Sequence, residues 1–248
     1  MTGDAAGRYF EGVLDQLRTA FDSQAEAVEQ SAQMAADAIA ADHVIYAFGA
    51  THGGILAQEI FYRAGGLVPV SPILPPGLTT DVRPIDLTSR MERLPGYAAL
   101  VLDSVPIVPG DLLIVISVSG RNTVTVEMAE LARSRGISVI AVTSLPYSRT
   151  VTSRAPSGKR LFEVADLVID LGGTPGDALV RMEGLPQAVG PTSTVVGAAL
   201  LNAWVARTAE KLLERGIEPP VFISANLDGG DQHNRRLLDK YRGRLTYL

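Results

Sequence analysis

Residues 111–143, DLLIVISVSGRNTVTVEMAELARSRGISVIAVT, contain the pattern that decides the fold of this chain. Residues 111–117 form a short apolar run, which is typical of a strand buried on both faces of a sheet. From residue 123 to residue 135 the apolar positions follow a helical period, and Gly136 stands where glycine often ends a helix. A second apolar run covers residues 137–143. Two buried strands joined by a helix predict a right-handed βαβ unit in a parallel sheet.

Similar apolar runs and helical patterns flank this unit and extend the same architecture. Further strands are predicted at residues 43–48, 67–73 and 167–171, and further helices at residues 10–41, 55–64, 97–104 and 194–215. The stretch 75–90 is predicted to be a loop, and residues 172–190 are rich in glycine. The tail from residue 219 is polar, with a candidate hinge at Gly229-Gly230.

We therefore predict an α/β fold, a three-layer αβα sandwich around a five-stranded parallel, flavodoxin-like sheet with a long N-terminal helix and a C-terminal arm. Within a single structural domain, residues 1–41 are expected to form a helical segment that packs on the main body. Residues 42–218 are expected to form that body, and residues 219–248 the arm.

Composition excludes several classes of protein. Of the 248 residues, 46% are hydrophobic and 20% are charged, which is ordinary for a folded globular protein and unlike a disordered one. The net charge of −5 argues against nucleic acid or an anionic membrane as the partner. No cysteine is present, which excludes disulfides, thiolate nucleophiles and cysteine zinc sites. No leader-like or membrane-spanning pattern is found, so a cytoplasmic location is expected.

The clearest chemical motif is SVSGRN at residues 117–122, between the predicted strand and the predicted helix. In such sheets, ligands bind at the carboxyl ends of the strands, near the point where the strand order switches. The hydroxyls of Ser117 and Ser119, the small Gly120 and free N–H groups at a helix N-terminus together suit a phosphate. The alternative is that Ser119 or Asn122 only caps the helix. The motif alone leaves both interpretations open.

Nucleotide-binding motifs are not matched. Residues 49–54, GATHGG, lack the middle glycine of the dinucleotide fingerprint, and residues 68–72 offer no carboxylate for a ribose. The phosphate-loop pattern G-x-x-x-x-G-K-[ST] also fails, because Arg160 follows Lys159. We therefore expect no cofactor, and the phosphate-binding motif requires no metal.

Residues 117–144, SVSGRNTVTVEMAELARSRGISVIAVTS, resemble the characteristic strand–loop–helix–strand segment of sugar isomerase (SIS) domains, which usually begins I-S-x-S-G-x-T and ends in T-S. Residues 48–53 (FGATHG), 59–67 (EIFYRAGGL) and 191–194 (PTST) are similar to a bacterial SIS branch labelled phosphoheptose isomerase-like. The resemblance covers most of the chain. It implies the SIS fold for residues 42–218 and a phosphorylated sugar as the small-molecule partner.

The resemblance also implies which residues hold the phosphate. Ser117, Ser119 and the backbone of Gly120 would bind it, with Asn122 at the position where many relatives have threonine.

The first glycine-rich turn of the family reads G-x-G-x-S and contributes its serine to the sugar or phosphate. This chain departs from that pattern, with Thr51 at the second glycine and Gly53 at the serine. Thr51 and Gly53 are still predicted to contact the sugar phosphate. Ser193 is a further candidate ligand, although Thr192 or Ser193 would also serve as the cap of the following helix.

Isomerising a sugar phosphate requires a base that moves a proton next to the carbonyl, and donors that stabilise the resulting enediolate. The candidates for proton transfer are His52, Glu59, Asp177 and His233. His52 would alternatively donate to a loop carbonyl, and Glu59 would alternatively pair with Arg63 on the surface of a helix. His233 would alternatively be an exposed loop residue. SIS enzymes of the glucosamine-6-phosphate synthase kind place a histidine in the site of a neighbouring subunit, and His233 is the residue here that resembles it.

We therefore predict that the chain binds a phosphorylated sugar and catalyses aldose–ketose isomerisation or related phosphosugar chemistry. The alternative is a non-catalytic module that binds and reports a phosphosugar, as SIS domains do when attached to repressors. The sequence leaves open which sugar phosphate is bound and whether the protein is an isomerase, an etherase or a sensor. A homodimer or larger homo-oligomer is predicted, because one sheet surface would not cover the long apolar stripe between Phe10 and Ile39.

Overall fold

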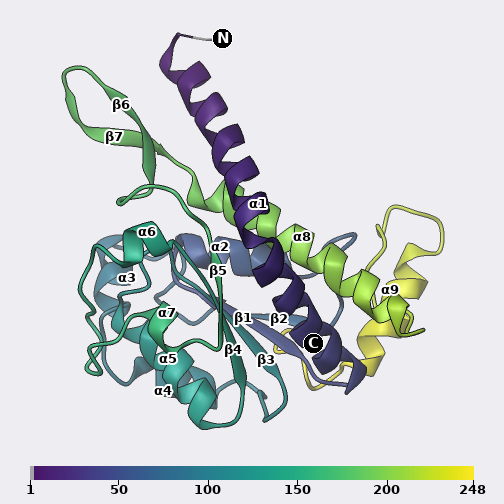
Figure 1. Cartoon of the computed structure of the whole chain (residues 1–248). Coiled ribbons are helices and arrows are strands. Elements are labelled where there is room, and N and C mark those ends of the chain that lie inside the picture. The colour runs from purple at the N-terminus through teal and green to yellow at the C-terminus, as the bar shows by residue number, and fades with distance from the viewer. Residues whose placement is uncertain (1–2) are drawn as a thin grey trace.

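A parallel sheet forms the centre of the computed structural model, which describes residues 3–248 (Figure 1). Its strands are β1 (Ile45–Gly49), β2 (Val70–Ile73), β3 (Leu112–Ile116), β4 (Ser138–Thr143) and β5 (Leu167–Asp170). They pair in the order β2-β1-β3-β4-β5, and every neighbouring pair is parallel. The predicted α/β class and five-stranded parallel sheet are therefore confirmed.

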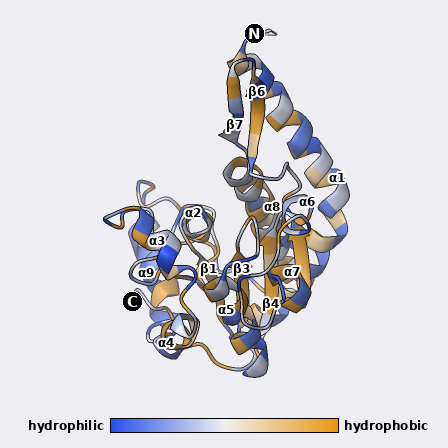
Figure 2. Ribbon diagram, turned by 90° about the vertical axis from the view of Figure 1, so that its left-hand side faces the viewer, coloured by the Kyte–Doolittle hydropathy of each residue, from blue (hydrophilic) through white to orange (hydrophobic). Residues whose placement is uncertain are grey.

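Helices cover both faces of the sheet, which is why its strands are almost continuously apolar. Along β3, Leu112, Ile114 and Ile116 belong to one hydrophobic core, whereas Leu113 and Val115 belong to the other. One face is covered by α1 (Ala5–Ala40), α2 (His52–Glu59) and α8 (Ser193–Glu214), and the other by α4 (Tyr97–Asp103), α5 (Thr123–Ser134) and α7 (Leu161–Val164). Figure 2 shows the hydrophobic residues gathered on the central strands between these layers. The strands therefore form a core that holds the loops at their ends in place.

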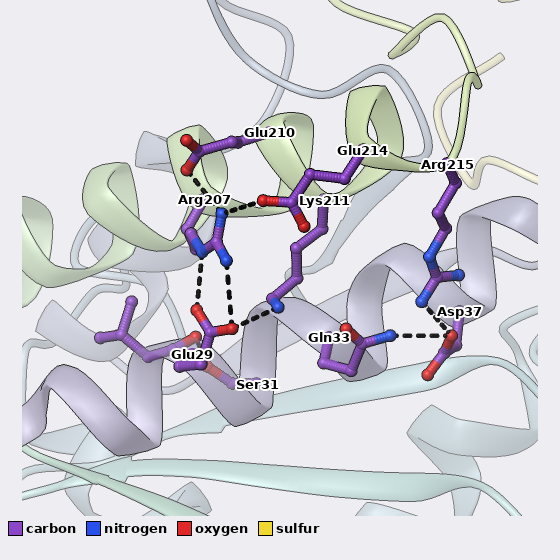
Figure 3. Close-up of polar contacts among 10 residues, drawn as sticks. Glu29, Ser31, Gln33, Asp37, Arg207, Glu210, Lys211, Glu214 and Arg215 are labelled. Atoms are coloured by element: carbon purple, nitrogen blue, oxygen red, sulfur yellow. Dashed lines mark hydrogen bonds and ion pairs between the residues drawn. The ribbon is translucent and has the colours of Figure 1, made fainter.

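The long helix α1 packs along α8, and charged side chains join the two helices (Figure 3). The Glu29 carboxylate on α1 accepts a hydrogen bond from Arg207 Nε at 2.6 Å and another from Lys211 Nζ. The hydrogen bonds from Arg207, and then the one from Lys211, lower the pKa of Glu29 to about 2. Lys211 is 6% exposed, so Glu29 supplies the negative charge that a buried ammonium group needs. These ion pairs hold α1, the N-terminal helix, against α8 on the body of the protein.

A β-hairpin formed by β6 (Ala178–Met182) and β7 (Leu185–Pro191) packs against the first half of α1 (Figure 1). The Tyr9 hydroxyl donates a hydrogen bond to the Pro191 carbonyl at 2.8 Å. No strand was predicted in this glycine-rich stretch, residues 172–190. Most residues of β7 are exposed, so its sequence lacks the alternation of apolar and polar residues that marks a half-buried strand.

The C-terminal arm contains a helix, α9 (Gly230–Lys240), that was not predicted. Only Gly230 and Asn234 are buried in it, so it lacks the apolar stripe on which a helix prediction depends. The arm is nevertheless attached to the sheet. Val221 forms an isolated antiparallel bridge with Leu67, and Arg244 Nη2 donates to the buried Asp111 carboxylate at 2.7 Å.

Two further boundaries differ from the predicted ones. Helix α2 ends at Glu59 instead of continuing to residue 64, because Tyr62 has a φ of 41° and the Gly65 N–H donates to the Phe222 carbonyl at 2.8 Å. A short helix, α3 (Asp86–Met91), lies at the end of the loop predicted for residues 75–90. The division of the chain at residues 41 and 218 stays a prediction. Within residues 3–248, no helix combines the length and the apolar character needed to cross a membrane.

Candidate functional site

A cleft of about 320 Å³ opens at the carboxyl ends of β1 and β3. These two strands form the point at which the strand order switches, since β2 lies on one side of β1 and β3 on the other. Loops that follow such a pair leave in different directions and open a crevice between them. The cleft is lined by residues of the loops after β1 and β3, the starts of α2 and α8, the end of α3, helix α6 (Leu145–Ser148), the segment before β6 and the end of β7. These residues are Ala50, Thr51, His52, Gly53, Glu92, Ser117, Val118, Ser119, Asn122, Tyr147, Gly176, Asp177, Pro191, Ser193 and Thr194.

The first loop brings Thr51, His52 and Gly53 to the cleft. Thr51 has a φ of 51°, which is rare for a β-branched residue, and its N–H donates to the Leu78 carbonyl at 2.6 Å. A Cβ atom at Gly53 would lie 2.6 Å from the Ile116 carbonyl oxygen, which belongs to the last residue of β3. The backbone at the start of α2 therefore touches the end of β3 at Gly53. This close approach leaves no room for the serine that the family pattern has at this position.

The second loop forms the turn from Ser117 to Asn122. Gly120 has a φ of 58°, and a Cβ atom there would lie 3.1 Å from both Thr143 Oγ1 and Ser148 Oγ, so glycine is required on two grounds. Its N–H donates to Ser117 Oγ at 3.2 Å.

The same turn presents free backbone donors. The N–H groups of Ser119, Arg121 and Thr123 donate to no acceptor within residues 3–248. Thr123 is the first residue of α5, so the positive end of a helix dipole lies beside them. Free N–H groups beside a helix N-terminus form a site that attracts an anion.

The side chain of Asn122 does not cap α5, so the capping interpretation is wrong for this residue. Its amide nitrogen donates to the Glu92 carboxylate, and its amide oxygen accepts from Arg154 Nη1 at 2.8 Å. The side chain of Ser119 makes no hydrogen bond to any acceptor or donor within residues 3–248, so it does not cap the helix either. Both serines of the turn line the cleft.

Glu92 lines the cleft and was not singled out from the sequence. It is half-buried at the end of α3, and burial raises its pKa above the usual value of 4.5, although the hydrogen bond from Asn122 opposes that shift. Its neighbours in the sequence are Met91 and Arg93. The sequence therefore does not distinguish Glu92 from an ordinary acidic residue exposed to solvent. The only sequence signal was the length of the preceding loop, since long loops often have functional roles.

Asp177 and Ser193 line the opposite part of the cleft and are bound to each other. Asp177 accepts hydrogen bonds from the Ser193 hydroxyl at 2.5 Å, the Ser193 N–H at 2.9 Å and the Thr192 N–H at 3.2 Å. The cap of α8 is therefore the Asp177 carboxylate. The prediction that Thr192 or Ser193 itself provides the cap was wrong, because the N-cap residue Thr192 makes no capping bond with its side chain.

The structure separates the histidine and glutamate candidates. His52 lines the cleft, and its ring makes no hydrogen bond within residues 3–248, so the alternative bond to a loop carbonyl is not formed. Glu59 lies outside the lining, where it pairs with Arg63 and accepts from Asn202 Nδ2 at 3.1 Å. His233 is on α9, also outside the lining, with Nε2 3.1 Å from the Val221 carbonyl. Among residues 3–248 no group of three or more His, Cys, Asp or Glu residues is arranged to hold a metal ion.

Comparison with protein families gives one matching domain model, the SIS domain, over residues 8–144. A UPF0309 protein of Shouchella clausii is 46% identical over 97% of this chain and 98% of its own length. A UPF0309 protein of Streptomyces coelicolor is 42% identical over 98% of this chain and 97% of its own length.

Solved structures show the same fold at low sequence identity. The phosphoheptose isomerase GmhA from Neisseria gonorrhoeae has a TM-score of 0.56 and 16% identity, covering 81% of this chain and 95% of its own. The NanR protein of Vibrio vulnificus, solved in complex with ManNAc-6P, has a TM-score of 0.52 and 15% identity, covering 99% of this chain and 71% of its own.

Proposed function

This chain belongs to the SIS domain family, and on that basis we propose that it binds a phosphorylated sugar in the cleft between β1 and β3 and catalyses aldose–ketose isomerisation or a related phosphosugar reaction there. The volume of about 320 Å³ is at the lower end of the range for small-molecule sites and suits one sugar phosphate.

The observation that carries the proposal is the turn at the start of α5. It combines two cleft-lining hydroxyls, Ser117 and Ser119, with a glycine in the left-handed region and N–H groups that have no acceptor within residues 3–248. A phosphate group accepts several hydrogen bonds at once and carries the negative charge that a helix N-terminus favours. The name of GmhA, a phosphoheptose isomerase, and the ManNAc-6P in the NanR complex support the same ligand class.

The remaining ligand candidates have unequal support. Thr51 and Gly53 line the cleft, but Gly53 contributes only backbone atoms. Asn122 would offer its N–H group, because both ends of its side chain are already bonded. The Ser193 hydroxyl donates its proton to Asp177. Ser193 would therefore contact the sugar through its other atoms.

For proton transfer, His52 has the best support of the residues proposed from the sequence, because it lies in the cleft. Glu59 and His233 lie outside the lining of the cleft in the same chain. They would take part only if a second copy of the chain brought them to it. The proposed homodimer or larger assembly would make this possible.

The first test is a thermal-shift screen of pairs of sugars that differ only in the phosphate, covering hexoses, heptoses and amino sugars. A ligand that binds only the folded state raises the apparent melting temperature. We expect at least one phosphorylated sugar to do so while its unphosphorylated partner does not. The sugars that bind are then incubated with the protein and followed by NMR for conversion between aldose and ketose. No response to any phosphorylated sugar would exclude the proposal, whereas binding without conversion would favour a sensor.

A further inference from the structure

A chain of three polar side chains leads from the surface to the cleft. Arg154 Nη1 donates to the Asn122 amide oxygen at 2.8 Å, and the Asn122 amide nitrogen donates to Glu92 Oε2. The two bonds fix the orientation of the amide, because its oxygen only accepts and its nitrogen only donates. The backbone supports the same arrangement, since the Val124 N–H donates to the Glu92 carbonyl at 3.0 Å and the Arg154 N–H donates to the Arg121 carbonyl at 2.8 Å.

The Glu92 carboxyl group differs from the other acidic group of the cleft. Asp177 is fully used in capping α8. Glu92, by contrast, forms no ion pair with a Lys, Arg or His residue anywhere in residues 3–248, and its Oε1 atom accepts no hydrogen bond there. One oxygen is thus held by Asn122 and the other is left for a ligand. A half-buried carboxyl group that is oriented by one partner and free on its other oxygen has the features of a general base.

We propose that Glu92 is the proton-transfer group of the cleft, and that Asn122 and Arg154 position it. This inference rests on the proposed function. In the forward step, Glu92 takes the proton from the carbon next to the carbonyl, and the electrons of the broken C–H bond form the double bond of the enediolate. The carboxylic acid then returns the proton to the former carbonyl carbon, while the hydroxyl proton moves from one substrate oxygen to the other. No oxidant or cofactor is required.

The electrostatic surroundings are compatible with this role. Burial raises the pKa of Glu92 above its usual 4.5, towards the pH at which a base transfers protons efficiently. Arg93 and Arg154 are the charged groups that oppose the shift. Across the cleft, His52 and Tyr147 are the other titratable side chains besides the capping Asp177.

The test measures deuterium exchange by NMR in D₂O with fructose 6-phosphate and sedoheptulose 7-phosphate as probes. General-base catalysis contributes typically about 100- to 10,000-fold, so Glu92→Gln should lower the exchange rate at the carbon next to the carbonyl by about 100-fold or more. Its dissociation constant for the probes should change little. The matched control is Glu127→Gln, which removes a carboxylate that accepts from the Gly96 N–H outside the cleft, and it should exchange like the wild type.

The positioning role is tested by the pH dependence of exchange. The Asn122 hydrogen bond lowers the pKa of Glu92, so Asn122→Ala should move the acidic limb of the profile to higher pH. A purely structural effect of Asn122 would lower the rate without moving that limb.

Failure of the Glu92 proposal can be told apart from failure of the proposed function. Equal exchange rates for Glu92→Gln and wild type, or binding to the wild type without any exchange, would overturn the role of Glu92. If neither probe nor any other phosphorylated sugar bound the wild type, the proposed function itself would fall.

Discussion

Replacing Gly53 by serine restores the residue that the family pattern has at this position, and the structure predicts that it destabilises this protein. The new Cβ atom would lie 2.6 Å from the Ile116 carbonyl oxygen, and it is attached directly to the backbone, so it cannot turn away. Ile116 is itself fully buried in β3. Relief therefore requires movement of the start of α2 or of the end of β3. Overpacking of this kind costs about 1 to 3 kcal/mol.

For a chain of this size, about 1 kcal/mol corresponds to about 2 to 4 °C, so the melting temperature should fall by about 2 to 12 °C. Gly53→Ala should behave similarly, because it places the same Cβ atom. Helix propensity predicts the opposite sign, since Gly53 lies in α2 and alanine is normally about 1 kcal/mol better than glycine inside a helix. Urea and thermal unfolding of both variants provide the measurement. A midpoint equal to or above that of the wild type would refute the close approach of α2 to the end of β3.

Three further predictions concern charge and association. Glu29→Gln leaves Lys211 buried without its carboxylate and should lower the urea midpoint at pH 7. Because the pKa of Glu29 is lowered from 4.5 to about 2, the difference should shrink as the pH falls through that range. Glu92→Gln should instead raise the urea midpoint at pH 8, because burial disfavours the charged carboxylate and so raises the pKa of Glu92. This gain in stability should vanish below pH 4.5, where the carboxyl group is protonated in both the folded and the unfolded state. A gain that persisted there would contradict this explanation. Sedimentation at micromolar concentration should show a dimer or larger species, because Phe10 and Phe21 on α1 are 54% and 43% exposed; a single species of 26.3 kDa would contradict this.

The central sheet could be predicted because its physical cause is local. Strand β3 is apolar on both faces, α5 has an apolar stripe of helical period, and Gly136, with a φ of 77°, ends α5 as expected. The hairpin β6–β7 and the helix α9 could not be predicted in this way. They lie on the surface and bury few side chains, so their sequences lack the periodic patterns on which prediction depends.

The candidate site could be predicted only in part. The turn of Ser117 and Gly120 and the loop of His52 were recognised, because each directly follows a buried strand and parallel strands end at one edge. Glu92 was missed, since its place in the cleft depends on packing between α3 and the start of α5, which are distant in the sequence. For Glu59, the local i, i+4 spacing to Arg63 had already indicated the alternative that the structure shows, an ion pair outside the cleft.

The central claim is that the turn at the start of α5 binds the phosphate of a sugar phosphate. It is tested most directly by calorimetric titration of wild type and Ser117→Ala with Ser119→Ala, using a sugar phosphate that binds in the thermal-shift screen. Each lost hydroxyl bond to a charged oxygen should cost about 1.5 to 3 kcal/mol, so the double variant should bind at least about 100-fold more weakly. Its urea midpoint should show that the fold is kept. An unchanged dissociation constant in a folded double variant would contradict the claim.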